Sequence, residues 1–146
     1  MEVGSHELLA QLVALGSSSL LQYVSQSGMW AAAPAAKSAM ANVLSLAAEE
    51  REDTTRFTRF LQKKHIRLPP LGAFPSHFTT MNFVTVEYLL PKLISEHIKE
   101  NAAIERLVNR ISDEEIRAMA QGYLDKKCRH LETLRELAES KTPAPV

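Results

Sequence analysis

The chain has 146 residues, enough for one domain with a single core and too few for two. Its 17 basic and 17 acidic side chains cancel, so we expect neither nucleic acid nor a membrane as a partner, because both attract net positive charge. A single cysteine excludes an internal disulfide framework. With no basic leader and no apolar run of about 18 residues, the sequence predicts a cytoplasmic protein.

The spacing of apolar residues predicts that the first half of the chain forms two long helices. Leucines three and four residues apart predict a first helix over about residues 6–29, and helix formers after Pro34 predict a second over about 35–64. Residues 66–80 contain three prolines and a glycine, so they cannot be regular helix. Extended, they reach roughly 50 Å, comparable with the ~45 Å of a helix of about 30 residues. This connection can therefore run the length of a helical bundle.

The second half of the chain shows the same periodicity. It predicts a third helix over about residues 81–110, with Pro91 as the site of a kink. A capping sequence, Ser112-Asp113-Glu114-Glu115, predicts the start of a fourth helix over about residues 113–140. Residues 141–146 contain two prolines and are expected to be disordered. Because β-type alternation is lacking, the sequence predicts one all-α domain over residues 1–146.

Polar and charged residues interrupt the apolar stripe near the midpoint of every predicted helix. If four helices of similar length lie side by side, their midpoints share one height, so these residues should meet in a single layer. Buried charges in such a layer need partners, since an unpaired one costs several kcal/mol. The residues are Ser18, Ser19 and Gln22 on the first helix, Glu50 and Asp53 on the second, Glu96, His97 and Glu100 on the third, and Lys127 and His130 on the fourth.

Two kinds of chemistry fit this layer. Pairs at i, i+3 spacing project from one helix face, and carboxylates with imidazoles that converge in a bundle core can hold a pair of metal ions. The same residues can close a salt-bridge network that Lys127 neutralises. Taken alone, Lys127 is expected on a solvated face, because Lys126 can take the inward position instead. His130 is expected to be neutral and hydrogen-bonded.

Three choices within the layer stay open at this point. Glu50 is the strongest candidate for a buried site residue. Thr54 competes with Asp53 for the inward position on the second helix. The kink at Pro91 decides which of the third-helix candidates, Glu96, His97 and Glu100, faces the core.

Several segments resemble the ferritin-like superfamily of bacterioferritin and rubrerythrin type. They are Gln22-Tyr23 on the first helix, the end of the second helix from Arg56-Phe57 to Leu68-Pro69, and Leu131-Glu132-Thr133 on the fourth. The resemblance covers most of residues 6–138 and implies a ferritin-like four-helix bundle with a long connection between helices two and three. It also implies a di-iron site, with a Glu from each of two helices and a Glu-x-x-His from each of the others.

Carried over position by position, the metal site is incomplete. The second helix offers Glu50-x-x-Asp53, and the third offers Glu96 or Glu100. The fourth-helix motif falls near Leu124-x-x-Lys127, which has no ligand, so His130 is the substitute. The first helix has no acidic residue at the expected height. The candidate ligands for iron or manganese are therefore Glu50, Asp53, Glu96, His97, Glu100 and His130, with Lys127 as a replacement for the charge of the metal.

Three functions follow as hypotheses. The first is a ferritin-like bundle without an intact di-iron centre, a non-catalytic binding or interaction module that forms a homodimer. The alternative is a divergent di-metal oxidase or hydroxylase that uses iron or manganese and O₂. A third is a small-molecule carrier, with space beside Gly16 and Ser17–Ser19, although small residues there also permit close helix packing. The sequence does not identify a substrate or ligand.

Overall fold

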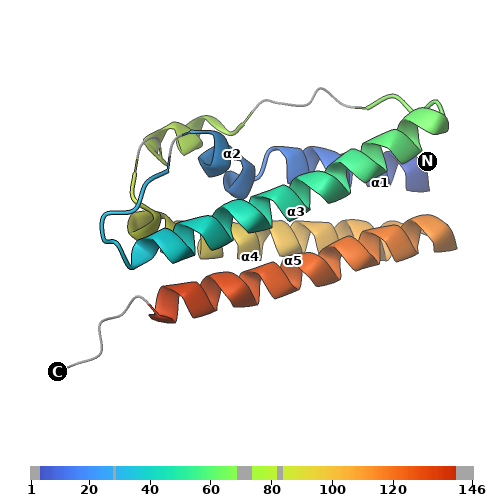
Figure 1. The fold of residues 1–146 in the computed structure, drawn as a ribbon. Coiled ribbons are helices and arrows are strands. Elements are labelled where there is room, and N and C mark those ends of the chain that lie inside the picture. The colour runs from blue at the N-terminus through green and yellow to red at the C-terminus, as the bar shows by residue number, and fades with distance from the viewer. Residues whose placement is uncertain (1–3, 28, 69–73, 82–83, 141–146) are drawn as a thin grey trace.

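The structure is a computed structural model that describes residues 4–27, 29–68, 74–81 and 84–140. Over these residues the chain is all-α, as the sequence predicts, with five α-helices and one 3-10 helix (Figure 1). In chain order the elements are α1 (Ser5–Ser17), α2 (Leu20–Gln26), α3 (Ala36–Lys63), η1 (Ser76–Met81), α4 (Val86–Arg110) and α5 (Glu114–Ser140).

The long helices lie alongside one another, and α1 and α2 follow each other along one side of them (Figure 1). Helices α3 and α4 run in the same direction, whereas α1, α2 and α5 run the opposite way (Figure 1). The chain leaves α3 at one end of the bundle, and η1 contacts α2 at the other end. The end of α3 and the start of η1 therefore lie at opposite ends of the bundle, and α3 and α4 are parallel.

The predicted first helix, residues 6–29, is wrong as one continuous element. The helix stops at Ser17 and restarts at Leu20, and the two parts are bent by 42°. Serine hydroxyls cause the break because they compete with helical backbone bonding. Ser18 Oγ donates to the Ala14 carbonyl at 2.8 Å, while Ser19 Oγ accepts from the Gln22 backbone N–H at 3.2 Å and caps α2.

The other predicted helices agree more closely with the structure. The second and fourth helices agree with α3 and α5 to within a residue. The predicted third helix corresponds to α4, which begins five residues later than predicted. Thr85 accepts a hydrogen bond from the Tyr88 backbone N–H and caps α4, and residues 76–81 form η1 instead. Helix α4 continues through Pro91. The predicted disordered tail, residues 141–146, lies outside the described residues.

The core consists of two apolar clusters. One contains side chains such as Leu12, Phe57 and Ile104, and the other contains side chains such as Val43 and Leu93. On every long helix the change from one cluster to the other occurs near the midpoint, and the buried polar side chains lie there. The polar layer predicted from the sequence is therefore a boundary between the two halves of the core.

Within the described residues, no single helix is both long and apolar enough to cross a membrane. The bent pair formed by α1 and α2 reaches that length and apolarity only when its two parts are counted together. Its leucines, such as Leu12 and Leu21, are buried in the two core clusters.

Candidate functional site

A buried ion pair between Glu50 on α3 and Lys127 on α5 forms the centre of the polar layer. Both residues are 0% exposed. Lys127 Nζ contacts Glu50 Oε2 directly and lies 3.6 Å from Glu100 Oε1 on α4. Three long helices are thus joined at one point by one cation and two carboxylates.

Hydrogen-bond donors surround the Glu50 carboxylate. Ser19 Oγ donates to Oε1 at 2.6 Å, and Gln22 Nε2 donates to the same oxygen at 3.0 Å. Tyr123 Oη donates to Oε2 at 3.4 Å, beside the Lys127 ammonium. A carboxylate has about four lone-pair positions, and these donors occupy all of them. The donors to Glu50 on α3 thus come from α2, with its cap residue Ser19, and from α5.

The expectation that Lys127 lies on a solvated face is wrong. Its own burial lowers the pKa of Lys127, but the carboxylates of Glu50 and Glu100 outweigh that effect and raise the pKa above its usual value. Lys127 is therefore a buried ammonium. The neighbouring Lys126 takes the outer position, where its Nζ lies 3.0 Å from Asp53 Oδ2 and its side chain is 31% exposed.

The structure distinguishes the three third-helix candidates. His97 is buried and Glu100 faces Lys127, whereas Glu96 lies at the rim of the layer, near Lys99 and His77. Burial raises the pKa of Glu100 to about 7; Lys127 opposes this shift, and Glu50 and Glu96 add to it. Glu100 is consequently the member of the layer whose charge changes near neutral pH.

Both histidines of the layer are neutral. His97 Nε2 lies 2.9 Å from the Lys127 carbonyl oxygen, which can only accept, so this nitrogen carries the hydrogen. Burial and then the charge of Lys127 lower the pKa of His97 to about 3. His130 Nε2 contacts Glu49 Oε2 at 2.7 Å, and burial lowers the pKa of His130. His130 is therefore hydrogen-bonded and neutral, as expected.

Asp53 is buried but points to a different set of partners. Arg56 Nη2 lies 3.2 Å from Asp53 Oδ1, and Lys126 contacts both carboxylate oxygens. Thr54, which competed with Asp53 for the inward position, is buried as well. Asp53 thus forms a separate ion-pair cluster at the edge of the layer.

The predicted metal ligands do not converge on one point. No group of three or more His, Cys, Asp or Glu side chains among the described residues is arranged to hold a metal ion. Where the ligands of a metal pair would meet, Lys127 contacts Glu50 and Glu100. The donor set therefore does not fit a di-iron centre.

Sequence reasoning missed two participants in the polar layer, Tyr123 and Glu49. Tyr123 is 1% exposed; burial and then Glu50 raise its pKa, so it remains a neutral donor. Its hydroxyl fits against Gly16, where an added Cβ would lie 2.5 Å from Tyr123 Oη and 2.8 Å from Thr54 Cγ2. Glu49 is not among the residues predicted for the layer, yet it contacts His130. The position of Tyr123 one helical turn before Lys127 could have indicated that its side chain reaches the polar layer.

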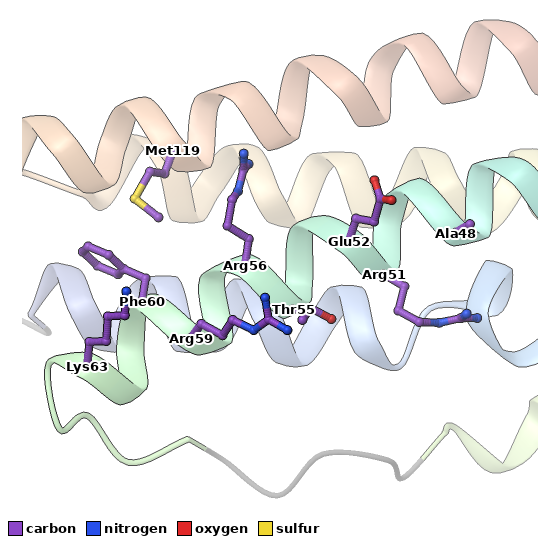
Figure 2. Close-up of a pocket in the computed structure, with 9 residues that line it drawn as sticks. All are labelled: Ala48, Arg51, Glu52, Thr55, Arg56, Arg59, Phe60, Lys63 and Met119. Atoms are coloured by element: carbon purple, nitrogen blue, oxygen red, sulfur yellow. The ribbon is translucent and has the colours of Figure 1, made fainter.

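The space expected beside Gly16 for a carried molecule is filled by Tyr123 and Thr54. Three grooves of about 690, 540 and 400 Å³ lie on the surface of the described residues. The largest follows α3 and reaches Met119 on α5 (Figure 2). Gln22 and Thr54 of the polar layer also line the smallest.

Comparison of the chain with protein-family models, with curated proteins and with solved structures gave no match.

Proposed function

We propose that this protein is a ferritin-like four-helix bundle without an intact di-iron centre, and that it acts as a non-catalytic binding or interaction module. One observation carries the proposal: a fully buried ammonium, Lys127, contacts Glu50 and Glu100 where this family places its metal ions. The cation supplies positive charge to the carboxylates without supplying a centre that can bind O₂.

The helix arrangement supports the ferritin-like part of the proposal. The long connection after α3 makes α3 and α4 parallel, and α5 returns antiparallel to them (Figure 1). Ferritin-like bundles have one long crossover and place their metal ligands at inward positions on the facing helices. The layer that contains Glu50, His97 and Lys127 lies between the two apolar clusters, and this position supports the comparison with such a site.

The alternative, a di-metal oxidase or hydroxylase, requires open coordination positions. Ser19, Gln22, Tyr123 and Lys127 occupy the lone pairs of Glu50. The Nε2 atom of His97 bonds to the backbone. The arrangement therefore favours a structural or binding role over a catalytic one.

Metal analysis tests this proposal. The protein is produced in medium that contains added iron and manganese, and is purified without chelator before elemental analysis. We expect far less than one metal ion per chain. Stoichiometric iron or manganese that is lost in Glu50→Ala would contradict the proposal.

A second experiment tests whether the Lys127 ammonium replaces the charge of a metal ion. In Lys127→Ala the two carboxylates of Glu50 and Glu100 lose their cation, and added Mn²⁺ should raise the unfolding temperature of this variant. The same Mn²⁺ should leave the wild-type protein unchanged. Stabilisation of the wild type, or no response in the variant, would refute the substitution of metal by lysine.

The proposed interaction partner is a second copy of the chain. Four large apolar side chains among the described residues are exposed, Trp30, Leu44, Tyr88 and Ile98, and the two aromatic ones are of types enriched at interfaces. The backbone of Trp30 bonds to Val84 and Val86, which places Trp30 at the start of α4, the helix that carries Tyr88. Light scattering coupled to gel filtration should give the mass of a dimer; a monomer would contradict this part.

A further inference from the structure

The groove along α3 is lined by a row of cations. Arg51, Thr55, Arg59 and Lys63 follow one another at four-residue spacing and so share one face of the helix. Arg56 extends from the adjacent face, and Glu52 is the single carboxylate in the lining (Figure 2). The whole chain has no net charge, so this concentration of cations is a local feature.

Two of these cations have no ion-pair partner among the residues that the structure describes. Arg59 and Lys63 are exposed and form no ion pair with any of the described residues. The hydrogen bonds of the Arg51 guanidinium go to neutral groups, Gln22 Oε1 at 3.3 Å and Ser25 Oγ at 3.5 Å. Like charges held together repel each other, and a bound anion would relieve that repulsion.

One end of the groove is apolar. Phe60 on α3 and Met119 on α5 approach each other at the end near Lys63 (Figure 2). The groove has a volume of about 690 Å³, which is within the range of ~300–1,000 Å³ typical of small-molecule sites. An aromatic or apolar body can pack against Phe60 while anionic groups face the arginines.

We propose that this groove binds a phosphorylated small molecule with an aromatic or apolar body. Phosphate is favoured over carboxylate because each phosphate ester carries about −1.5 to −2 charge, and the guanidinium of Arg51 or Arg59 matches its oxygens in bidentate geometry. The Thr55 hydroxyl lies between them as a further donor. This inference extends the proposed binding role to a ligand class.

The groove is also linked to the polar layer. Gln22 accepts from Arg51 Nε through Oε1 and donates to Glu50 through Nε2. Neither Glu50 nor Lys127 lines the groove. A negative result with ATP would therefore contradict the phosphate-binding groove and leave the proposal for the polar layer intact, and a positive metal analysis would do the reverse.

Calorimetric titration with ATP at low salt tests the inference, with inorganic triphosphate and adenosine as separate probes. We expect ATP to bind more tightly than triphosphate, adenosine not to bind, and added salt to weaken binding. Arg59→Gln/Lys63→Gln should weaken ATP binding by about tenfold or more. The matched control Arg129→Gln/Arg135→Gln removes two exposed cations of α5 and should leave ATP binding unchanged.

Three results would overturn the inference. The first is the absence of ATP binding, and the second is an equal loss in the control variant, which would indicate attraction by general charge. The third is binding of phosphatidylglycerol vesicles without binding of ATP, which would make the groove a lipid-headgroup surface. Circular dichroism of each variant establishes that it is folded.

Discussion

Replacement of Lys127 by methionine, which has a similar shape and no charge, is the sharpest test of the buried ion pair. It leaves the Glu50 carboxylate 0% exposed and without its cation. Removing one partner of a buried pair costs about 3–5 kcal/mol, because the remaining charge is neither solvated nor neutralised. The donors Ser19, Gln22 and Tyr123 stay in place, so the loss should fall within that range and not exceed it.

The double variant Glu50→Gln/Lys127→Met separates the ion pair from the packing of the layer. A glutamine at position 50 can still accept from Ser19 and Gln22, so the double variant should be more stable than Lys127→Met alone. Lys99→Met is the matched control: Lys99 is 71% exposed, and its loss should change stability by less than about 1 kcal/mol. Free energies come from urea unfolding followed by circular dichroism. An equal, small loss in Lys127→Met and Lys99→Met would refute the buried pair.

Two further predictions concern Gly16 and Glu100. Gly16→Ala should lower the free energy of unfolding by about 1–3 kcal/mol, because the added Cβ meets the Tyr123 hydroxyl. The control Gly122→Ala has open space around it and should raise the free energy of unfolding by about 0.5–1 kcal/mol. Equal effects of the two variants in urea unfolding would contradict the tight fit at Gly16. Burial raises the pKa of Glu100 from 4.5 to about 7, so the folded state holds the proton of this carboxyl more tightly than the unfolded chain does. Glu100 therefore lowers the free energy of unfolding as the pH rises from about 4.5 to about 7. Glu100→Gln should therefore gain up to about 3 kcal/mol relative to wild type between about pH 5 and about pH 8, and parallel stability profiles would refute the assignment.

The sequence predicts the general organisation of this fold because helical periodicity and length constrain it strongly. The second and fourth helices, the long connection and the mid-height polar layer all follow from these two properties. Orientation within the layer does not follow. Lys126 and Lys127, or Glu96 and His97, are adjacent on a helix and differ by about 100° around its axis. Only the packing of the neighbouring helices decides which side chain of each pair points inward.

Contacts between distant segments were also beyond sequence reasoning. The break at Ser18 and Ser19 was missed because serine is compatible with a helix, and the hydrogen bond from Ser19 to Glu50 on another helix adds to the local serine bonds that favour the break. The fit of Tyr123 against Gly16 likewise depends on how closely α1 and α5 approach. Such details need the three-dimensional arrangement.

The most direct measurement is a proton–nitrogen correlation spectrum selective for lysine ammonium groups. The account predicts an ammonium signal that is protected from exchange with water near neutral pH, because Lys127 is buried and the carboxylates raise its pKa. That signal should disappear in Lys127→Met and persist in Lys126→Met. If all lysine ammonium groups exchange as exposed ones do, or if Lys127 is a neutral amine, the claim that Lys127 is a buried cation between Glu50 and Glu100 is contradicted.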